Sequence, residues 1–154
     1  HLCDRRQRQM CIRDSYIFKR FAFYRLDKIK EVCKSNECTN KNEMMMRADT
    51  AVQKLWGVSF GKENYTEKLE MTVRIAKDEE YILKRLEREK RNGTIQKLAN
   101  GDYKFMTEVY DASEMVPWIK TFTGRIVEIK CSNERVEKQI KEDFEMMKRI
   151  YEVR

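Results

Sequence analysis

The chain has 154 residues, of which 33 are lysine or arginine and 26 are aspartate or glutamate, so its net charge is +7. This length allows one ordinary domain, or one small domain and part of another. No apolar run approaches the roughly 18 residues of a membrane span and no signal peptide is apparent, so we expect a cytoplasmic protein without a membrane partner.

The opening segment does not look like native sequence. Residues 5–15, RRQRQMCIRDS, back-translate in a single frame to a common transposase adapter of sequencing libraries, and residues 1–4 fit the bases in front of it. We therefore assign residues 1–15 to an adapter-derived segment and expect them to pack on nothing. The rest of the chain has 29 basic and 24 acidic residues, a net charge of +5, which permits an acidic partner without requiring one.

Motifs for catalysis and metal binding are missing from the rest of the chain. The only histidine is His1, so no Ser-His or Cys-His pair remains. Cys33, Cys38 and Cys131 have no obvious fourth ligand, and they predict free thiols rather than a zinc site. There is no phosphate loop, Rossmann fingerprint, H-E-x-x-H or G-x-S-x-G motif. The sequence predicts no catalytic residue, no metal, no cofactor and no enzymatic activity.

Two segments come before the clearest pattern. Residues 16–34 are rich in aromatic and β-branched residues, and they predict one or two strands without their partners. Residues 35–64 predict a linker and then a helix over 43–56, where apolar residues recur at helical spacing and Gly57 follows as a cap.

Residues 65–154 alternate between strand and helix patterns. LEMTVRI (69–75) alternates apolar and polar residues, which is typical of a half-buried strand. The predicted order is a strand, a helix over 81–91, strands at 94–98 and 103–110, a helix from Asp111, a strand at 125–131 and a helix capped by Asn133. This is the order of an α+β, ferredoxin-like βαββαβ sandwich with an added C-terminal helix.

The helix ends are predicted from capping residues. Asp78 is expected to cap the helix over 81–91, which should end at Asn92-Gly93. Asp111 is expected to cap the next helix with Glu114 as its capping-box partner. Pro117 should kink that helix or push its regular part downstream, because proline lacks the N–H that a helix interior needs.

Four segments in combination resemble a known family. They are FYRLDKIKEV (23–32), WGVSFG (56–61), YILKRLEREKRNGTI (81–95) and YDASEMVPWIKTFTGRI (110–126). Together they resemble the WYL-domain transcriptional regulators of bacteria, whose Sm-like barrel is closed by a segment that here reads Arg25-Leu26-Asp27-Lys28-Ile29. The resemblance covers residues 16–154.

The resemblance implies a modular regulator with a winged helix-turn-helix, a ligand-sensing WYL barrel and a ferredoxin-like extension. It assigns residues 16–34 to the remnant of the barrel, 35–64 to a linker and helix, and 65–154 to the extension. The helix-turn-helix and the Trp-Tyr-Leu motif are not in this sequence, so duplex DNA would be bound only through the missing domain. The family further implies a homodimer whose barrel binds a nucleotide or single-stranded nucleic acid.

Candidate site residues are of two kinds. The candidate contacts for a nucleotide or single-stranded nucleic acid are Arg25, Lys28, Arg85, Arg88 and Arg125. Arg25 and Lys28 follow from the resemblance, whereas the cations of KRLEREKR (84–91) suit phosphates but are more typical of a solvated helix face. The residues predicted to form the structural core are Trp56, Trp118 and Phe122.

Two other classes of function remain open. A free-standing module for single-stranded nucleic acid or a nucleotide would expose paired aromatics on its sheet, and Tyr103, Phe105 and Tyr110 are candidates. An acylphosphatase-like enzyme would need a phosphate-binding loop with an arginine after the first strand, where IAKDEE (75–80) has acids instead.

Overall fold

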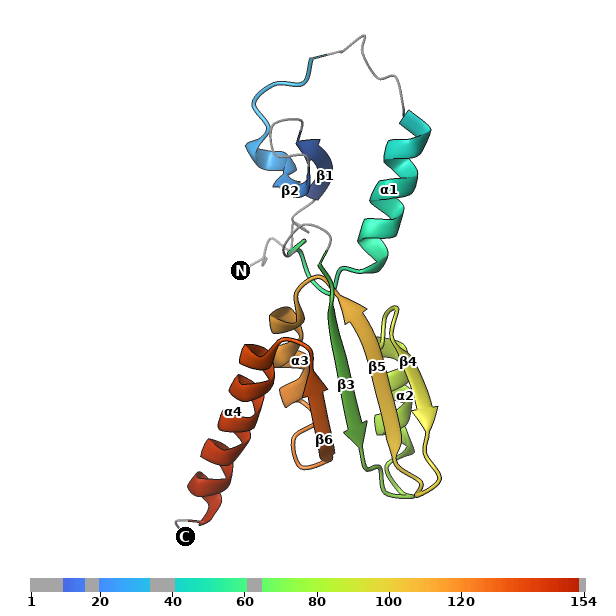
Figure 1. The fold of residues 1–154 in the computed structure, drawn as a ribbon, viewed down its shortest axis with the longest axis vertical. Helices are drawn as coiled ribbons and strands as arrows, with labels where there is room; N and C mark the ends of the chain where they lie inside the picture. The colour runs from blue at the N-terminus through green and yellow to red at the C-terminus, as the bar shows by residue number, and fades with distance from the viewer. Residues whose placement is uncertain (1–9, 16–19, 34–40, 61–64, 153–154) are drawn as a thin grey trace, which may run out of the picture. The chain divides into compact units, whose positions relative to one another are not determined.

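The computed structural model describes residues 10–15, 20–33, 41–60 and 65–152 (Figure 1). The chain divides between Gln53 and Lys54 into two compact units. The second unit contains the buried core of the protein, and this core includes Trp56, which lies upstream of the predicted domain start at residue 65.

The first unit is a two-stranded sheet and a helix. Strand β1 (Met10–Ser15) pairs with β2 (Arg20–Arg25) in antiparallel register from Met10–Arg25 to Ser15–Arg20; η1 (Leu26–Lys28) and α1 (Lys41–Gln53) follow. The expectation that residues 1–15 pack on nothing is therefore wrong for β1, while residues 1–9 lie outside the described residues. Strands β1 and β2 pair through backbone N–H and C=O groups. Any segment in an extended conformation can bind an unpaired strand edge in this way, so the pairing does not depend on particular side chains.

The second unit has the fold class expected from the sequence. Its sheet has the strand order β4-β5-β3-β6, and all neighbouring strands are antiparallel. The elements are β3 (Glu67–Val73), α2 (Glu80–Glu89), β4 (Thr94–Lys97), β5 (Tyr103–Val109), η2 (Ala112–Met115), α3 (Val116–Lys120), β6 (Ile126–Cys131) and α4 (Glu134–Glu152). Each helical crossover skips one strand, which is the split βαβ arrangement of a ferredoxin-like sandwich. The prediction of an α+β fold of this type is confirmed.

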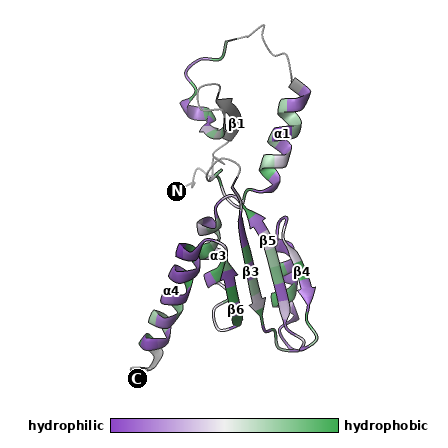
Figure 2. Cartoon of the chain, viewed as in Figure 1, coloured by the Kyte–Doolittle hydropathy of each residue, from purple (hydrophilic) through white to green (hydrophobic). Residues whose placement is uncertain are grey.

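The core lies between the sheet and its helices. Leu69, Met71 and Val73 alternate along β3 and are fully buried, because every second residue of a strand points to the same face. The helices bury Leu86, Ile119, Phe122 and Ile140 against that face. Figure 2 shows the contrast between hydrophobic residues on β3 and β6 and the largely hydrophilic α4.

Two of the predicted caps are confirmed. The carboxylate of Asp111 accepts a hydrogen bond from the Ser113 N–H at 3.0 Å, and Asn133 accepts one from the Arg135 N–H at 3.1 Å. Pro117 lies in the first turn of α3, after the 3-10 turn η2, so it shifts the regular part of the helix downstream as predicted.

Three local predictions are wrong. Helix α2 is preceded by Glu79 rather than Asp78, and it ends at Glu89 with Arg91 in the left-handed conformation (φ 49°). Gly93 does not end the helix. A glycine fits at this position because a Cβ there would lie 2.3 Å from a ring carbon of Phe105. Glu114 is not a capping-box partner, since its carboxylate binds a loop more than fifty residues upstream.

Candidate functional site

The two predicted cations of the first unit are exposed and lie close together in sequence. Arg25 donates two hydrogen bonds to Asp27, at 2.9 and 2.6 Å, and this pairing lowers the pKa of the Asp27 carboxyl. Lys28 lines a hollow of about 630 Å³ together with Tyr24, Ile29 and Val32. Arg25 is therefore ion-paired, while the exposed Lys28 and Lys30 line a hollow that also has apolar side chains.

Arg85 and Arg88 of α2 are brought together by one carboxylate. Arg85 Nε and Arg88 Nη2 both lie 3.0 Å from Glu89, which also accepts a 3.0 Å hydrogen bond from the Trp118 indole. Burial acts to raise the pKa of Glu89, but the hydrogen bonds from Arg88, Trp118 and Arg85 outweigh it and lower the pKa. Arg85 and Arg88 therefore bind the carboxylate that also accepts the Trp118 indole N–H. This is the behaviour of cations on an ordinary charged helix face.

Arg125 is also paired with a carboxylate. Its guanidinium binds both oxygens of Glu79, and this contact is the largest cause of the lowered pKa of the Glu79 carboxyl. Within the second unit, Arg125 is therefore held by Glu79, while Arg85 and Arg88 are held by Glu89. Of the five predicted cations, all except Lys28 have a carboxylate partner. This partner offsets part of the positive charge that a phosphate would bind.

The predicted core aromatics form one cluster behind these ion pairs. The Trp118 ring lies 4.9 Å from Trp56, 5.2 Å from Phe105 and 5.0 Å from Phe122, measured between centroids. The Arg91 guanidinium lies 4.8 Å from the centroid of the Trp56 ring. Trp56 and Phe122 are buried and Trp118 is half-buried, with its indole N–H bound to Glu89. This distribution suits a packed core in which the Trp118 indole N–H is satisfied by Glu89.

The sheet face opposite the helices has no platform for stacking bases. Phe105 is fully buried on the helix-covered face, and Tyr103 packs against the same core. Tyr110 follows β5 and lies against Phe60 at 6.1 Å between ring centroids. The opposite face instead carries ion pairs such as Lys104–Glu70, 2.6 Å apart. Base stacking on an exposed sheet needs aromatic rings there, so the described sheet gives no support to that alternative.

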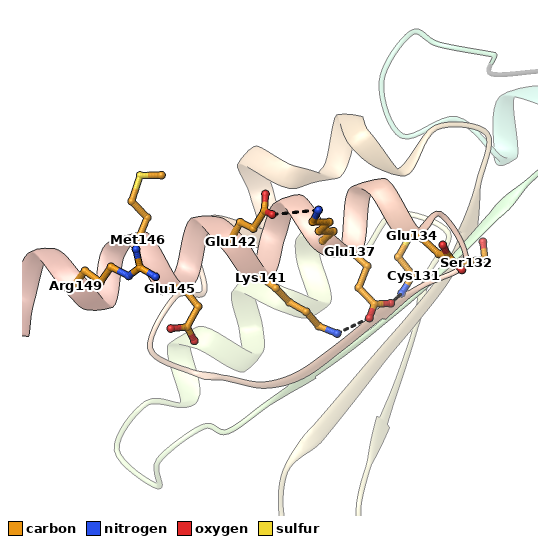
Figure 3. A pocket seen from close by; sticks show the side chains of 10 residues that line it. Cys131, Ser132, Glu134, Glu137, Lys141, Glu142, Glu145, Met146 and Arg149 are labelled. Carbon is orange, nitrogen blue, oxygen red and sulfur yellow. Dashed lines mark hydrogen bonds and ion pairs between the residues drawn. The ribbon is translucent and has the colours of Figure 1, made fainter.

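A groove runs along α4 beside the end of β6 (Figure 3). Its volume is about 1070 Å³, and we call it the α4 groove. It is lined by Cys131, Ser132, Glu134, Glu137, Lys138, Lys141, Glu142, Glu145, Met146 and Arg149. The residues from α4 recur every three or four positions, so they share one face of the helix. That face carries charges of both signs around the exposed Met146.

Glu137 connects α4 to the free edge of the sheet. Because the Ser132 N–H donates to Lys68 on β3, the neighbouring Cys131 N–H points toward the open side of β6. Glu137 accepts that N–H at 2.8 Å and pairs with Lys141 at 2.5 Å, and Figure 3 shows both contacts. These two interactions lower the pKa of the Glu137 carboxyl. The carboxylate therefore occupies an edge donor that an added strand would use.

Cys131 is not set up for chemistry at the groove. The residue is buried, and this burial raises the pKa of its thiol. A thiol with a raised pKa is a weak nucleophile, since the reactive form is the thiolate. Among the described residues, no group of three histidine, cysteine or acidic side chains is placed to hold a metal ion. None of the described helices is long and apolar enough to cross a membrane.

Glu114 and Glu137 are the site residues that sequence reasoning missed. The Glu114 carboxylate accepts the backbone N–H groups of Gly57 and Val58 at 2.9 Å, and that of Ser59 at 3.2 Å. Nothing in the local sequence marks a contact over such a separation. Glu137 had a weak signal, because a strand that leads directly into a helix N-terminus brings the first-turn acids close to the strand end.

Comparison of the chain with protein-family models, curated proteins and solved structures gave no match.

Proposed function

We propose that this chain is the C-terminal effector-sensing and oligomerisation part of a WYL-type bacterial transcriptional regulator. The observation that carries the proposal is the succession of an R-L-D-K-I segment at residues 25–29 and a ferredoxin-like unit with an added helix. In this proposal β2 is the last strand of the barrel, and duplex DNA is bound by a helix-turn-helix outside these residues. The protein acts in the cytoplasm and catalyses no reaction.

The α4 groove is the surface that we propose for the homodimer. Glu142 and Glu145 precede the exposed Met146, and Arg149 follows it. In this C-terminal part of the groove the acids precede the base along the helix. Such a surface is complementary to itself after a two-fold rotation, because each acid then meets the base of the other copy. Ile150, which is 65 % exposed, adds a second apolar side chain next to this face.

A charge-swap experiment on the full chain tests this interface by analytical ultracentrifugation. We expect a dimer for the wild type, a monomer for Arg149→Glu, and a restored dimer for the double variant Glu145→Arg/Arg149→Glu. Lys68→Glu makes the same charge change outside the groove and serves as the control. A monomeric wild type, or a dimer that Arg149→Glu leaves intact, contradicts the proposed interface.

A DNA titration tests the regulatory part of the proposal. Specific readout of duplex DNA needs a helix or ribbon in the major groove, and we assign that role to a separate domain. We therefore expect residues 16–154 to bind random duplex and a native promoter equally, with an affinity that falls steeply as salt is added. Tight, salt-resistant and promoter-specific binding would place a DNA-reading surface within these residues and overturn the proposal.

A further inference from the structure

A second cleft lies at the opposite end of the sheet from the β6–α4 turn. Its volume is about 500 Å³, and it lies between the β3–α2 connection and the hairpin that joins β4 to β5. Arg74, Lys77 and Lys97 line it together with the apolar side chains of Ile75 and Leu83. The size is within the range of small-molecule sites, which combine an apolar wall with a few polar groups.

The two lysines of this cleft differ from the cations singled out in the sequence. Among the described residues, neither Lys77 nor Lys97 has a carboxylate within ion-pair distance; the ammonium of Lys97 lies 5.8 Å from the centroid of the Tyr103 ring. By contrast, Arg85 and Arg88 share the carboxylate of Glu89, and Arg125 is paired with Glu79. The cleft therefore holds two cations that have no ion-pair partner among the described residues.

Arg74 is fixed at the cleft by a buried acid. Its Nε and Nη2 atoms lie 3.1 and 3.4 Å from the carboxylate of Asp102, whose side chain is only 6 % exposed. Asn100 also donates to that carboxylate at 2.9 Å and accepts the Asp102 N–H at 3.1 Å. A guanidinium has five N–H donors, so three remain after the pairing with Asp102. The Arg74 side chain is 68 % exposed and can present them to a ligand.

We propose that this cleft binds the phosphate group of a small phosphate monoester. Lys77 and Lys97 supply the uncompensated charge, and the free N–H groups of Arg74 match the geometry of phosphate oxygens. Ile75 and Leu83 contact the organic part of the ligand. The other acid of the cleft, Glu80, is paired with Lys84 at 3.4 Å and so does not offset the lysines.

The cleft favours a small ligand over a nucleic-acid backbone. A backbone needs a continuous track of positive charge beyond a single site. The neighbouring sheet face alternates acids and bases, as in the pairs Lys104–Glu70 and Lys130–Glu128. The proposal does not depend on the assignment to WYL regulators.

Isothermal titration of the full chain with adenosine 5′-monophosphate tests the proposal, with adenosine as the uncharged comparison. We expect saturable binding of the monophosphate, no binding of adenosine, and competition by inorganic phosphate. Lys77→Gln/Lys97→Gln should bind about tenfold more weakly, because two charge-assisted hydrogen bonds to phosphate are lost. Lys68→Gln/Arg135→Gln removes two cations outside the cleft and should bind as the wild type does.

Both double variants alter exposed lysines or arginines, and an unchanged unfolding midpoint shows that each has folded. Equal affinity of the wild type and Lys77→Gln/Lys97→Gln would overturn the proposal, as would binding of adenosine or a lack of competition by phosphate. A short oligothymidylate that binds more tightly than the monophosphate, and that both double variants weaken equally, would also overturn it. That outcome would indicate diffuse binding of a backbone across the surface.

Discussion

Strands β2 and β3 are both rich in apolar residues but lie in very different environments. Strand β3, EKLEMTV, alternates apolar and polar residues, whereas β2, RFAFYR, has an uninterrupted run of apolar and aromatic residues from Phe21 to Tyr24. The apolar residues of β3 are fully buried under helices, whereas Phe21 and Phe23 of β2 are half-buried and Tyr24 is 42 % exposed. Burial of apolar area is the main favourable contribution to folding, so the two units should differ strongly in stability.

The difference shows that a strand pattern in the sequence does not tell what covers the strand. In the second unit, helical segments follow β3, β5 and β6 directly in the chain, so most of the covering layer is encoded locally. In the first unit the described residues contain one partner strand for β2, and a two-stranded sheet is marginal in water. Both tryptophans of the chain, Trp56 and Trp118, belong to the second unit, so tryptophan fluorescence reports on that unit alone.

The largest expected effect is at the centre of the aromatic cluster. Trp118→Ala should lower the free energy of unfolding of the second unit by about 3–5 kcal/mol, because it removes contacts with three rings and the hydrogen bond to Glu89. Chemical denaturation followed by circular dichroism and Trp56 fluorescence measures this loss. Tyr24→Ala in the first unit is the comparison, and it should change the same transition by less than about 0.5 kcal/mol.

Glu114 should have the next largest effect. Glu114→Ala leaves three backbone N–H groups without their carboxylate and should cost about 2 kcal/mol. Glu114→Gln, which keeps one oxygen as an acceptor, should cost less. Asp78→Ala, which removes an exposed acid without a described partner, is the control in the same denaturation experiment. Equal midpoints for all three variants would mean that the contact with residues 57–59 does not stabilise the unit.

The second unit should also lose stability in acid. The folded-state pKa values of Glu79, Glu89 and Glu137 are lowered, so their contribution is complete above the unfolded pKa of about 4.3 and is lost as the pH falls through the folded values. The denaturation midpoint should therefore fall as the pH is lowered from neutral to about pH 3. Glu137→Gln should make the fall shallower, because it removes one of the carboxyls whose pKa is lowered in the folded state.

The smallest effect is expected for the opening segment. Deleting residues 1–15 removes β1 but no residue of the second unit, so the tryptophan transition should shift by less than about 0.5 kcal/mol. A chain with residues 1–15 in scrambled order serves as the control and should behave in the same way. A loss above about 1 kcal/mol on deletion, absent in the scrambled chain, would contradict the interpretation of this segment as translated adapter.

Local patterns were enough to predict the fold of the second unit. The alternation in β3, the caps at Asp111 and Asn133, and the displacement caused by Pro117 all depend on neighbours in sequence, and all are observed. One of the wrong predictions concerns a choice between the adjacent acids Asp78 and Glu79, which the local sequence does not distinguish. There the long-range contact with Arg125 selects Glu79.

The candidate site was less predictable than the fold. Sequence shows that a cation is present, but its availability depends on which carboxylates approach it from other elements. Arg125 looks available in the sequence and is bound to Glu79, forty-six residues away. No sequence motif marks Lys77 or Lys97 as a site residue. They share a cleft because the β3–α2 connection and the β4–β5 hairpin lie at the same end of the sheet.

The contact between Glu137 and the edge of β6 has a consequence for aggregation. A free edge donor is a template on which a strand of another molecule can grow, and repeated addition produces fibres. The Glu137 carboxylate fills that position at Cys131 only while it is ionised and held by Lys141. Protonation in acid weakens this protection under the same conditions that destabilise the unit, so the wild type should assemble into thioflavin-positive fibres sooner in acid. Replacing Glu137 by alanine should bring this assembly forward at neutral pH, where the wild-type carboxylate is ionised, and should change it less in acid.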